Sequence, residues 1–384
     1  MASPNPLTSA ATSSPVGGLC PAYVVADPDT AALRVAGLTT LDRLLVAAHR
    51  AGLAPLTVVA TQELPPIPRT RAWRIPFQVV SAADPAGGRA VWLRTDALVQ
   101  AVDLKRLAAA GSARLTDAEG VGVLAVSVPK GWAGGDPFRE AEGTAPLRAE
   151  GVACVVRNAG EARRATRCLW ASIRSSADGT VDRWFNRPVG RPLARLLIPT
   201  PVTPNMISVA ATLLGLVSAA MFAVGNPAWS VIAAVLFQGS AILDCVDGDV
   251  ARVAFKESPL GKWLDLVGDQ VVHIGVFLGI TAGVMRSGGG AHMAWLGALA
   301  VVGAAMSFWR VLRGMRRPPE AGGSGRLQGL IDAATNRDFS VLVLILAILG
   351  RLEVFLWLAG LGSHVFWMLL AWLQREPRPV AGRS

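Results

Sequence analysis

Apolar and polar residues follow two different patterns along this chain of 384 residues. Between residues 20 and 160, short β-branched runs alternate with segments whose apolar residues recur at helical spacing. This alternation is typical of a small α/β domain with a mainly parallel sheet. The predicted strands are residues 22–26, 56–61, 77–81, 90–94 and 121–128. The predicted helices are residues 38–51 and 103–110.

After residue 200 the apolar runs become long enough to cross a bilayer, which takes about 20 residues per helix. We therefore expect an α-helical integral membrane domain with six transmembrane helices at residues 201–374. The predicted spans are residues 205–224, 228–254, 260–285, 293–309, 339–349 and 354–373. At ~1.5 Å per residue the second span exceeds a ~30 Å hydrocarbon core, so its end is expected to project beyond the core.

Three further segments complete the predicted organisation. Residues 1–19 are rich in Pro, Ser and Ala and are expected to be disordered, without the basic and apolar regions of a signal peptide. Residues 161–200 are a linker followed by an amphipathic helix, kinked near Pro188 and Pro192, that lies in the membrane interface. Residues 375–384 form a tail.

The chain carries a formal net charge of +10, with its arginines clustered beside the apolar runs. In that position they bind anionic head groups and set orientation, so the charge does not indicate a nucleic-acid partner. Most basic residues lie in the tails and in the connections between spans two and three and spans four and five. The positive-inside rule therefore predicts a multi-pass protein of the cell inner membrane with both termini and the α/β domain in the cytoplasm. The four cysteines have no metal-binding spacing and are expected to be reduced thiols.

Aspartates interrupt the second and third predicted spans, where a carboxylate is costly and indicates a functional site. Asp244 and Asp247 are three residues apart, and Asp265 and Asp269 are four apart, so each pair shares a helix face. Four carboxylates cannot stay ionised close together in a low dielectric without cations. We expect them to line a single cleft that holds two Mg²⁺ or Mn²⁺ ions.

Small residues and one arginine accompany the acids. Gly248, Ala251 and Gly261 would let a phosphorylated ligand approach the backbone, and Arg252 offers a planar cation suited to a diphosphate. The residues together predict a metal-dependent phosphotransfer site at a membrane surface.

The order D-x-x-D-G-x-x-A-R, eight residues, G-x-x-x-D-x-x-x-D resembles the signature of the CDP-alcohol phosphotransferase (CDP-alcohol phosphatidyltransferase) family, with all eight fixed positions present. The resemblance covers roughly the C-terminal half of the chain, and in this family homodimers are common. It implies that Asp244, Asp247 and Asp265 hold the cations and that Asp269 is a further ligand or the base that activates the acceptor hydroxyl. It also implies a CDP pocket shaped by Gly248, Ala251, Arg252 and Gly261.

The α/β domain resembles a degenerate nucleotidyltransferase. Within the family, the chain resembles bifunctional inositol-phosphate cytidylyltransferase/di-inositol-phosphate phosphate synthases, which carry such a domain. However, the residues after the first strand read A-D-P-D-T and lack the Gly-rich, basic loop that a triphosphate requires. Asp96 is more consistent with a turn than with a metal site. We expect this domain to be non-catalytic.

The predicted activity is transfer of a substituted phosphate group from a CDP-linked donor to an alcohol with release of CMP, with an inositol phosphate as donor moiety or acceptor. One alternative is a phospholipid synthase that uses CDP-diacylglycerol. Another is a cation- or proton-coupled transporter, which would need acids near the bilayer midplane and an internal repeat. Arg310 and Arg313 either bind an acceptor phosphate or anchor the topology, and His273 is expected to be an interior packing residue.

Overall fold

The structure is a computed structural model that describes residues 20–83, 89–120, 122–130, 132, 135–173, 179–315 and 339–373. The predicted disordered segment at 1–19 and the predicted tail at 375–384 lie outside the described residues. The chain divides into two compact units, Met1–Ser172 and Ile173–Ser384.

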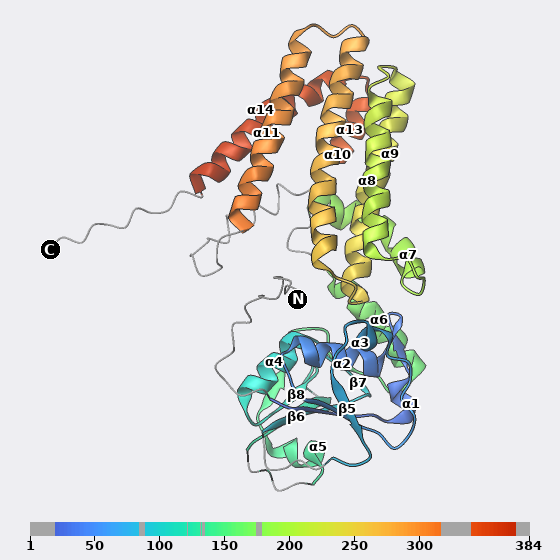
Figure 1. Cartoon of the computed structure of the whole chain (residues 1–384), viewed down its shortest axis with the longest axis vertical. Helices are drawn as coiled ribbons and strands as arrows, with labels where there is room; N and C mark the ends of the chain where they lie inside the picture. The colour runs from blue at the N-terminus through green and yellow to red at the C-terminus, as the bar shows by residue number, and fades with distance from the viewer. Residues whose placement is uncertain are drawn as a thin grey trace, which may run out of the picture. The chain divides into compact units, whose positions relative to one another are not determined.

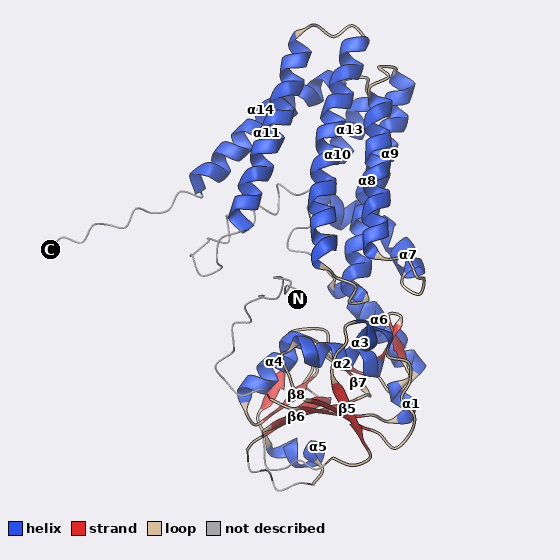
Figure 2. Ribbon diagram, viewed as in Figure 1, coloured by secondary structure: helices blue, strands red, loops and turns tan. Residues whose placement is uncertain are grey.

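The first unit is built on a seven-stranded mixed sheet with the order β10-β8-β9-β6-β1-β4-β5 (Figures 1 and 2). Its strands are β1 (Ala22–Val25), β4 (Leu56–Val59), β5 (Phe77–Val80), β6 (Ala90–Arg94), β8 (Ala113–Thr116), β9 (Val123–Val128) and β10 (Pro146–Arg148). β1 pairs in parallel with β4 and β6, and β4 with β5, whereas β9 is antiparallel to both of its neighbours. The five predicted strands are confirmed, and β8 and β10 were not predicted.

Helices pack on this sheet through buried apolar faces and specific caps. They are α1 (Pro28–Ala31), α2 (Thr40–Arg50), α3 (Pro68–Ala72), α4 (Ala101–Ala110), α5 (Pro137–Glu140), the 3₁₀ turn η1 (Ala141–Gly143) and α6 (Ala159–Ser172). Thr39 caps α2 by accepting from the backbone N–H of Asp42 at 3.2 Å. The fully buried Asp42 carboxylate accepts from the backbone N–H groups of Arg69 and Thr70, at 2.9 and 2.7 Å, and so holds α3 against α2. The two predicted helices, now α2 and α4, are confirmed.

Two-residue strands complete the unit. β2 (Arg34–Val35) pairs with β3 (Leu38–Thr39), and β7 (Ala97–Leu98) pairs with β11 (Cys154–Val155). The β7–β11 pair connects the segment that leads into α6 to the end of β6. The α/β unit therefore extends from Ala22 to the end of α6.

The second unit is helical (Figure 2). Its helices are the π-helix η2 (Asp182–Asn186), α7 (Arg187–Leu197), α8 (Pro204–Phe222), α9 (Pro227–Val253), α10 (Pro259–Arg286), α11 (His292–Met315), α13 (Phe339–Ile348) and α14 (Leu352–Leu373). Five of them, α8 to α11 and α14, are long and apolar enough to cross a membrane, which makes this a multi-pass membrane protein. The described part of the fifth predicted span, α13, has 10 residues and rises only ~15 Å, so the count of six spans stays a prediction.

Small residues allow α8 to pack closely against both α9 and α10. A Cβ atom at Gly215 of α8 would lie 2.6 Å from Val272 of α10, and Gly279 faces the backbone carbonyl of Ala219. Such contacts are typical of membrane helices, where close packing replaces the hydrophobic effect as the driving force. α11 packs along α14, and both lean away from α10 toward the end of the bundle where α10 begins (Figure 1).

The predicted amphipathic helix is present as η2 and α7, although it begins with a π turn and continues through Pro192. It buries Arg187, Gly190 and Ala194 and leaves Trp184 and Leu196 exposed. A Cβ atom at Gly190 would lie 2.8 Å from Val246, so α7 packs closely on α9. Its position in the membrane interface stays a prediction.

Thiol alkylation tests the packing of the first unit. Burial raises the pKa of the Cys154 thiol to about 11, whereas Cys168 on α6 is exposed. Because the thiolate is the reactive form, only roughly a thousandth of Cys154 is reactive at pH 8. We expect iodoacetamide at pH 8 to label Cys168 at least about tenfold faster than Cys154, and labelling of Cys154 to accelerate toward pH 10. Peptide mass spectrometry measures both rates, and equal rates at pH 8 would contradict this packing.

Candidate functional site

The ends of α9 and α10 are fixed by local contacts in the short connection between them. After α9 ends at Val253, the backbone N–H of Lys256 donates to the carbonyl of Ala251 at 2.8 Å. Ser258 then caps α10 by accepting from the N–H of Gly261 at 2.9 Å, with proline in the first turn. The last turns of α9 and the first turns of α10 therefore lie at the same end of the bundle.

Three of the four predicted acids come together at this end. One carboxylate oxygen from each of Asp244, Asp247 and Asp265 lies within 4.8 Å of the other two, and no other such group occurs among the residues that the structure describes. Asp247 is buried, Asp244 is half-buried and Asp265 is exposed. A set of three carboxylates from two helices suits a hard divalent cation such as Mg²⁺ or Mn²⁺, which takes oxygen ligands.

Helix α8 supplies two residues to this site that the sequence did not indicate. The Ser208 hydroxyl donates to Oδ2 of Asp247 at 2.5 Å, and Asn205 lies beside the start of α10. A Cβ atom at Gly261 would lie 2.7 Å from Oδ1 of Asn205, which explains the glycine. The sequence offered one signal for these residues, the helix cap Thr203, which accepts from the N–H of Met206. The cap fixes where α8 begins and therefore which residues of its first turn share a face.

The predicted pocket residues share one cavity of about 170 Å³ with two of the acids. It is lined by Gly248, Ala251, Arg252, Gly261, Asp247 and Asp265, and also by Asn205, Ser208, Lys256 and Lys262. A Cβ atom at Gly248 would lie 3.0 Å from Nη2 of Arg252, so the glycine leaves room for that guanidinium. Basic groups and carboxylates thus line the same cavity, a combination that suits a metal-bound phosphate ester.

Asp269 lies outside the group of three acids. It lines a second cavity, of about 260 Å³, together with Gln270, His273, Ser307 of α11 and Phe339 of α13. Asp265 and Asp269, one helical turn apart, therefore line different cavities, whereas the spacing alone had predicted one cleft. The ring of His273 is almost buried and packs 5.0 Å from that of Phe339, consistent with the predicted interior histidine.

Arg310 and Arg313, predicted either to bind an acceptor phosphate or to anchor the topology, lie near the end of α11. The guanidinium groups of Arg310 and Arg313 lie 5.0 and 5.5 Å from the ring centre of Trp309, within cation–π distance. Neither residue is among the described residues that line the two cavities.

An apolar groove of about 380 Å³ runs between α8 and α10. Its lining includes Val209 and Leu213 of α8 and Trp263 and Val267 of α10, all exposed. Ser208 lines both this groove and the cavity beside the acids. An extended apolar chain could therefore lie in the groove while its polar head occupies the cavity.

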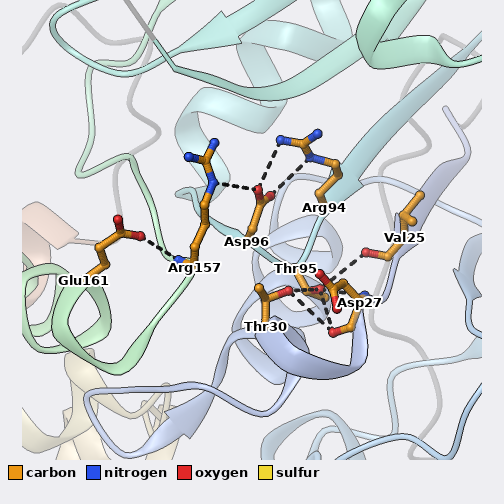
Figure 3. Close-up of polar contacts among 8 residues, drawn as sticks. All are labelled: Val25, Asp27, Thr30, Arg94, Thr95, Asp96, Arg157 and Glu161. Atoms are coloured by element: carbon orange, nitrogen blue, oxygen red, sulfur yellow. Dashed lines mark hydrogen bonds and ion pairs between the residues drawn. The ribbon is translucent and has the colours of Figure 1, made fainter.

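In the first unit, polar contacts occupy the carboxyl ends of β1 and β6, where an α/β sheet commonly takes its ligand (Figure 3). The hydroxyl groups of Thr30 and Thr95 lie 2.8 Å apart, and the backbone N–H of Asp27 donates to Oγ1 of Thr95 at 3.0 Å. The residues after β1 are thus tied to the end of β6 by internal hydrogen bonds.

Asp96 behaves as the predicted turn residue. Its carboxylate pairs with Arg94 at 3.1 Å and with Arg157 at 3.7 Å (Figure 3). Glu161 accepts from the backbone N–H of Arg157 at 2.7 Å, which fixes that arginine at the start of α6. The carboxylate that follows β6 is therefore engaged in an internal ion-pair network.

Comparison with known proteins matches residues 201–374 to the model of the CDP-alcohol phosphatidyltransferase family. Curated relatives named bifunctional IPC transferase and DIPP synthase are 37% identical over 123 residues in Thermococcus kodakarensis, 33% over 123 in Archaeoglobus fulgidus and 36% over 101 in Aquifex aeolicus. The matches cover 32%, 32% and 26% of this chain, and 27%, 24% and 22% of these relatives. The matched stretch is thus about a quarter of the length of each relative.

Two solved structures of Mycobacterium tuberculosis phosphatidylinositol phosphate synthase also match, each at 18% identity. The complex with CDP-DAG has a TM-score of 0.37 and covers 51% of this chain and 99% of that chain. The complex with manganese and citrate has a TM-score of 0.36 and covers 51% and 93%.

Removal of the buried carboxylate tests the acidic group as a cation site. We expect Asp247→Asn to weaken Mn²⁺ binding by at least about tenfold, because a ligand charge at the centre of the group is lost. Titration calorimetry on the purified protein in detergent measures the affinity. Asp96→Asn, in the first unit, is the matched control and should bind Mn²⁺ like the wild type. Equal affinities in all three proteins would exclude the acidic group as the cation site.

Proposed function

Because residues 201–374 match the model of the CDP-alcohol phosphatidyltransferase family, we propose that this chain belongs to that family and transfers a substituted phosphate group from a CDP-linked donor to an alcohol. The observation that carries the proposal is the approach of Asp244, Asp247 and Asp265 to within 4.8 Å beside a cavity lined by Arg252. Three acids and a cation donor in one place suit a metal-bound diphosphate.

The residues divide between two tasks. Gly248, Ala251 and Gly261 give the cytidine diphosphate close access to the helix backbones, and Arg252 pairs with its phosphate oxygens. Asp269, in the neighbouring cavity, accepts the proton of the acceptor hydroxyl. The hydroxyl oxygen then bonds to the phosphorus that bears the donor's alcohol group. The bond from that phosphorus to the bridging oxygen breaks, and CMP leaves with the electron pair.

Two divalent cations, Mg²⁺ or Mn²⁺, complete the proposed site. Asp244, Asp247 and Asp265 would hold them, with Asp269 as a further ligand if it is not only the base. Bound there, such ions offset the charge that develops on the diphosphate oxygens. The chemistry of the donor set, oxygen atoms only, favours these hard ions over softer ones.

An inositol phosphate is our first choice for the donor moiety or the acceptor alcohol. The relatives from Thermococcus and Archaeoglobus carry the names IPC transferase and DIPP synthase. The acidic signature lies within residues 201–374, which match the family model. The second cavity is mainly apolar, but Asp269, Gln270 and Ser307 give it polar groups that suit the hydroxyls of such an acceptor.

One observation favours a second candidate, a phospholipid synthase that uses CDP-diacylglycerol. The apolar groove between α8 and α10 shares the lining residue Ser208 with the site cavity, and both of its helices are long and apolar enough to cross a membrane. An acyl chain in the groove and a diphosphate in the cavity would fit one lipid donor. A soluble CDP-polyol would leave the groove without a role in donor binding.

The remaining parts of the proposal concern architecture. We propose six spans, with α13 as part of the fifth, both termini in the cytoplasm, and the cell inner membrane as the location. The basic connections between spans support this orientation. We also propose that the first unit is a degenerate nucleotidyltransferase domain without activity, since internal hydrogen bonds join the ends of β1 and β6. A homodimer stays a prediction from the family resemblance.

A transporter is less well supported. Such a protein would place its acids near the bilayer midplane. Here Asp247 lies in the last third of α9 and Asp265 in the first third of α10, at the connected ends of the two helices.

CMP release tests the proposed reaction. We expect membranes that contain the protein to release CMP from CDP-inositol or CDP-diacylglycerol with Mg²⁺, when an alcohol acceptor such as inositol phosphate is present, and to stop when EDTA is added. Asp269→Asn should lower the rate by about 10²–10⁴-fold, because the hydroxyl loses its proton acceptor. Asp96→Asn is the control and should release CMP at the wild-type rate. Ion flux without CMP release would favour the transporter instead.

A bulky residue in the groove tests whether the donor is CDP-diacylglycerol or CDP-inositol. Val209→Trp should raise the KM for CDP-diacylglycerol at least about fivefold by occupying acyl-chain space, and should leave the KM for CDP-inositol unchanged. Val235→Trp is the matched control, because Val235 on α9 is similarly exposed (54%, against 46% for Val209) but lies outside the groove. If the groove variant behaves like this control with CDP-diacylglycerol, the lipid-donor candidate is wrong.

A further inference from the structure

Asp249 stands out among the aspartates of α9 because it turns away from the acidic group. It lies two residues after Asp247, about 200° around the helix, and occupies an unspecified position of the family signature. Its side chain is almost completely buried. A buried carboxylate in a membrane helix needs a partner charge or hydrogen bonds to offset desolvation.

That partner comes from the amphipathic helix. Arg187, the first residue of α7, forms an ion pair with Oδ1 of Asp249, and its side chain is also buried. The two residues are 62 positions apart in the sequence, so the pair joins two separate elements. Removing one partner of such a pair would leave an uncompensated charge.

The same carboxylate oxygen also holds a residue of the proposed CDP pocket. Nη2 of Arg252 lies 3.3 Å from Oδ1 of Asp249. The Arg252 side chain passes over Gly248 and is 32% exposed, so it reaches the cavity. Asp249 thus connects a buried arginine on one side to a cavity-lining arginine on the other.

Further contacts fix α7 and η2 along α9. The amide nitrogen of Gln238 donates to Oδ1 of Asn186, and Asn186 donates to Asp182 at 2.7 Å. Together with the close approach of Gly190 to Val246, these contacts define the position of Arg187 relative to α9. Several contacts along η2, α7 and α9 therefore fix the position of the Arg187–Asp249 ion pair.

We propose that Arg187 and Asp249 are positioning residues that hold the Arg252 guanidinium in the orientation that binds the diphosphate of the donor. This inference rests on the proposed function. An arginine has many conformations, and fixing it before the ligand arrives removes part of the entropic cost of binding. The two arginines and one carboxylate keep one net positive charge, which the diphosphate would face.

Binding of CDP in the presence of Mn²⁺, measured by titration calorimetry on the full chain in detergent, tests this role without turnover. The neutral pair Arg187→Gln with Asp249→Asn removes both charges together, so neither is left buried alone. We expect it to raise the Kd of CDP roughly three- to tenfold while the Mn²⁺ affinity stays the same. Arg183→Gln, one turn earlier on the same segment and exposed, is the matched control and should bind CDP like the wild type.

A mutant cycle separates positioning from a general structural effect. If the pair acts through Arg252, then adding the neutral pair to Arg252→Gln should not weaken CDP binding further. A further loss in that background, or an unchanged Kd for the neutral pair alone, would overturn the proposal. Should the neutral pair show no thermal unfolding transition, the exchanged pair Arg187→Asp with Asp249→Arg is measured instead. It restores the ion pair but places a cation beside Arg252, so a wild-type Kd would also overturn the proposal and a raised Kd would support it.

CDP binding and CMP release by the wild-type protein distinguish a failure of the proposed function from a failure of this inference. A wild-type protein that binds CDP but releases no CMP contradicts the transferase and still permits the cycle. A wild-type protein that binds no CDP contradicts both.

Discussion

The cost of placing carboxylates inside membrane helices determines how the second unit is packed. The segment from Asp244 to Asp269 contains five aspartates, counting both ends. Each of the two buried ones has a hydrogen-bond or ion-pair partner on another helix. Ser208 of α8 donates to Asp247, and Arg187 of α7 pairs with Asp249. Because an unmatched buried charge would be strongly destabilising, α7 and α8 have to lie against α9 at these particular positions. Small residues such as Gly190 and Gly215 permit the close helix contacts that these positions need.

The eight signature residues identified the site, because their fixed spacing on two helices predicts which side chains share a face. Spacing within a helix cannot reveal which neighbour that face meets. Asp265 and Asp269 share a face of α10, but the face borders two cavities, since α8 covers one side and α11 and α13 the other. Ser208 and Arg187 were missed for the same reason, because they lie 39 and 62 residues from their partners.

In the first unit, the strands that were predicted are runs made mostly of apolar or β-branched residues, and one of them, β5, lies at an edge of the sheet. β10 was missed because it has only three residues, begins with a proline and is largely exposed at the sheet edge, and β8 was missed because its four residues include a single β-branched one. The sequence after β1 lacks a Gly-rich loop, and the expected absence of activity in this unit stays a prediction. That sequence could not indicate Thr95, whose hydroxyl joins the end of β1 to β6, because this contact spans 68 residues.

The separation of Asp265 from Asp269 suits a transfer between two bound molecules. One helical turn separates Asp265 from Asp269 by ~6 Å along α10. A donor held at the first residue and an acceptor held at the second can therefore meet at a phosphorus atom between them. A donor held by the three clustered acids and Arg252 would present its diphosphate from the first cavity. An acceptor in the second cavity would place its hydroxyl near Asp269, which lies outside the group of three acids. If all four carboxylates converged on one point, the acceptor's proton would have no separate base, and donor and acceptor would compete for the same space. The division of α10 between two cavities therefore suits the chemistry of the proposed function.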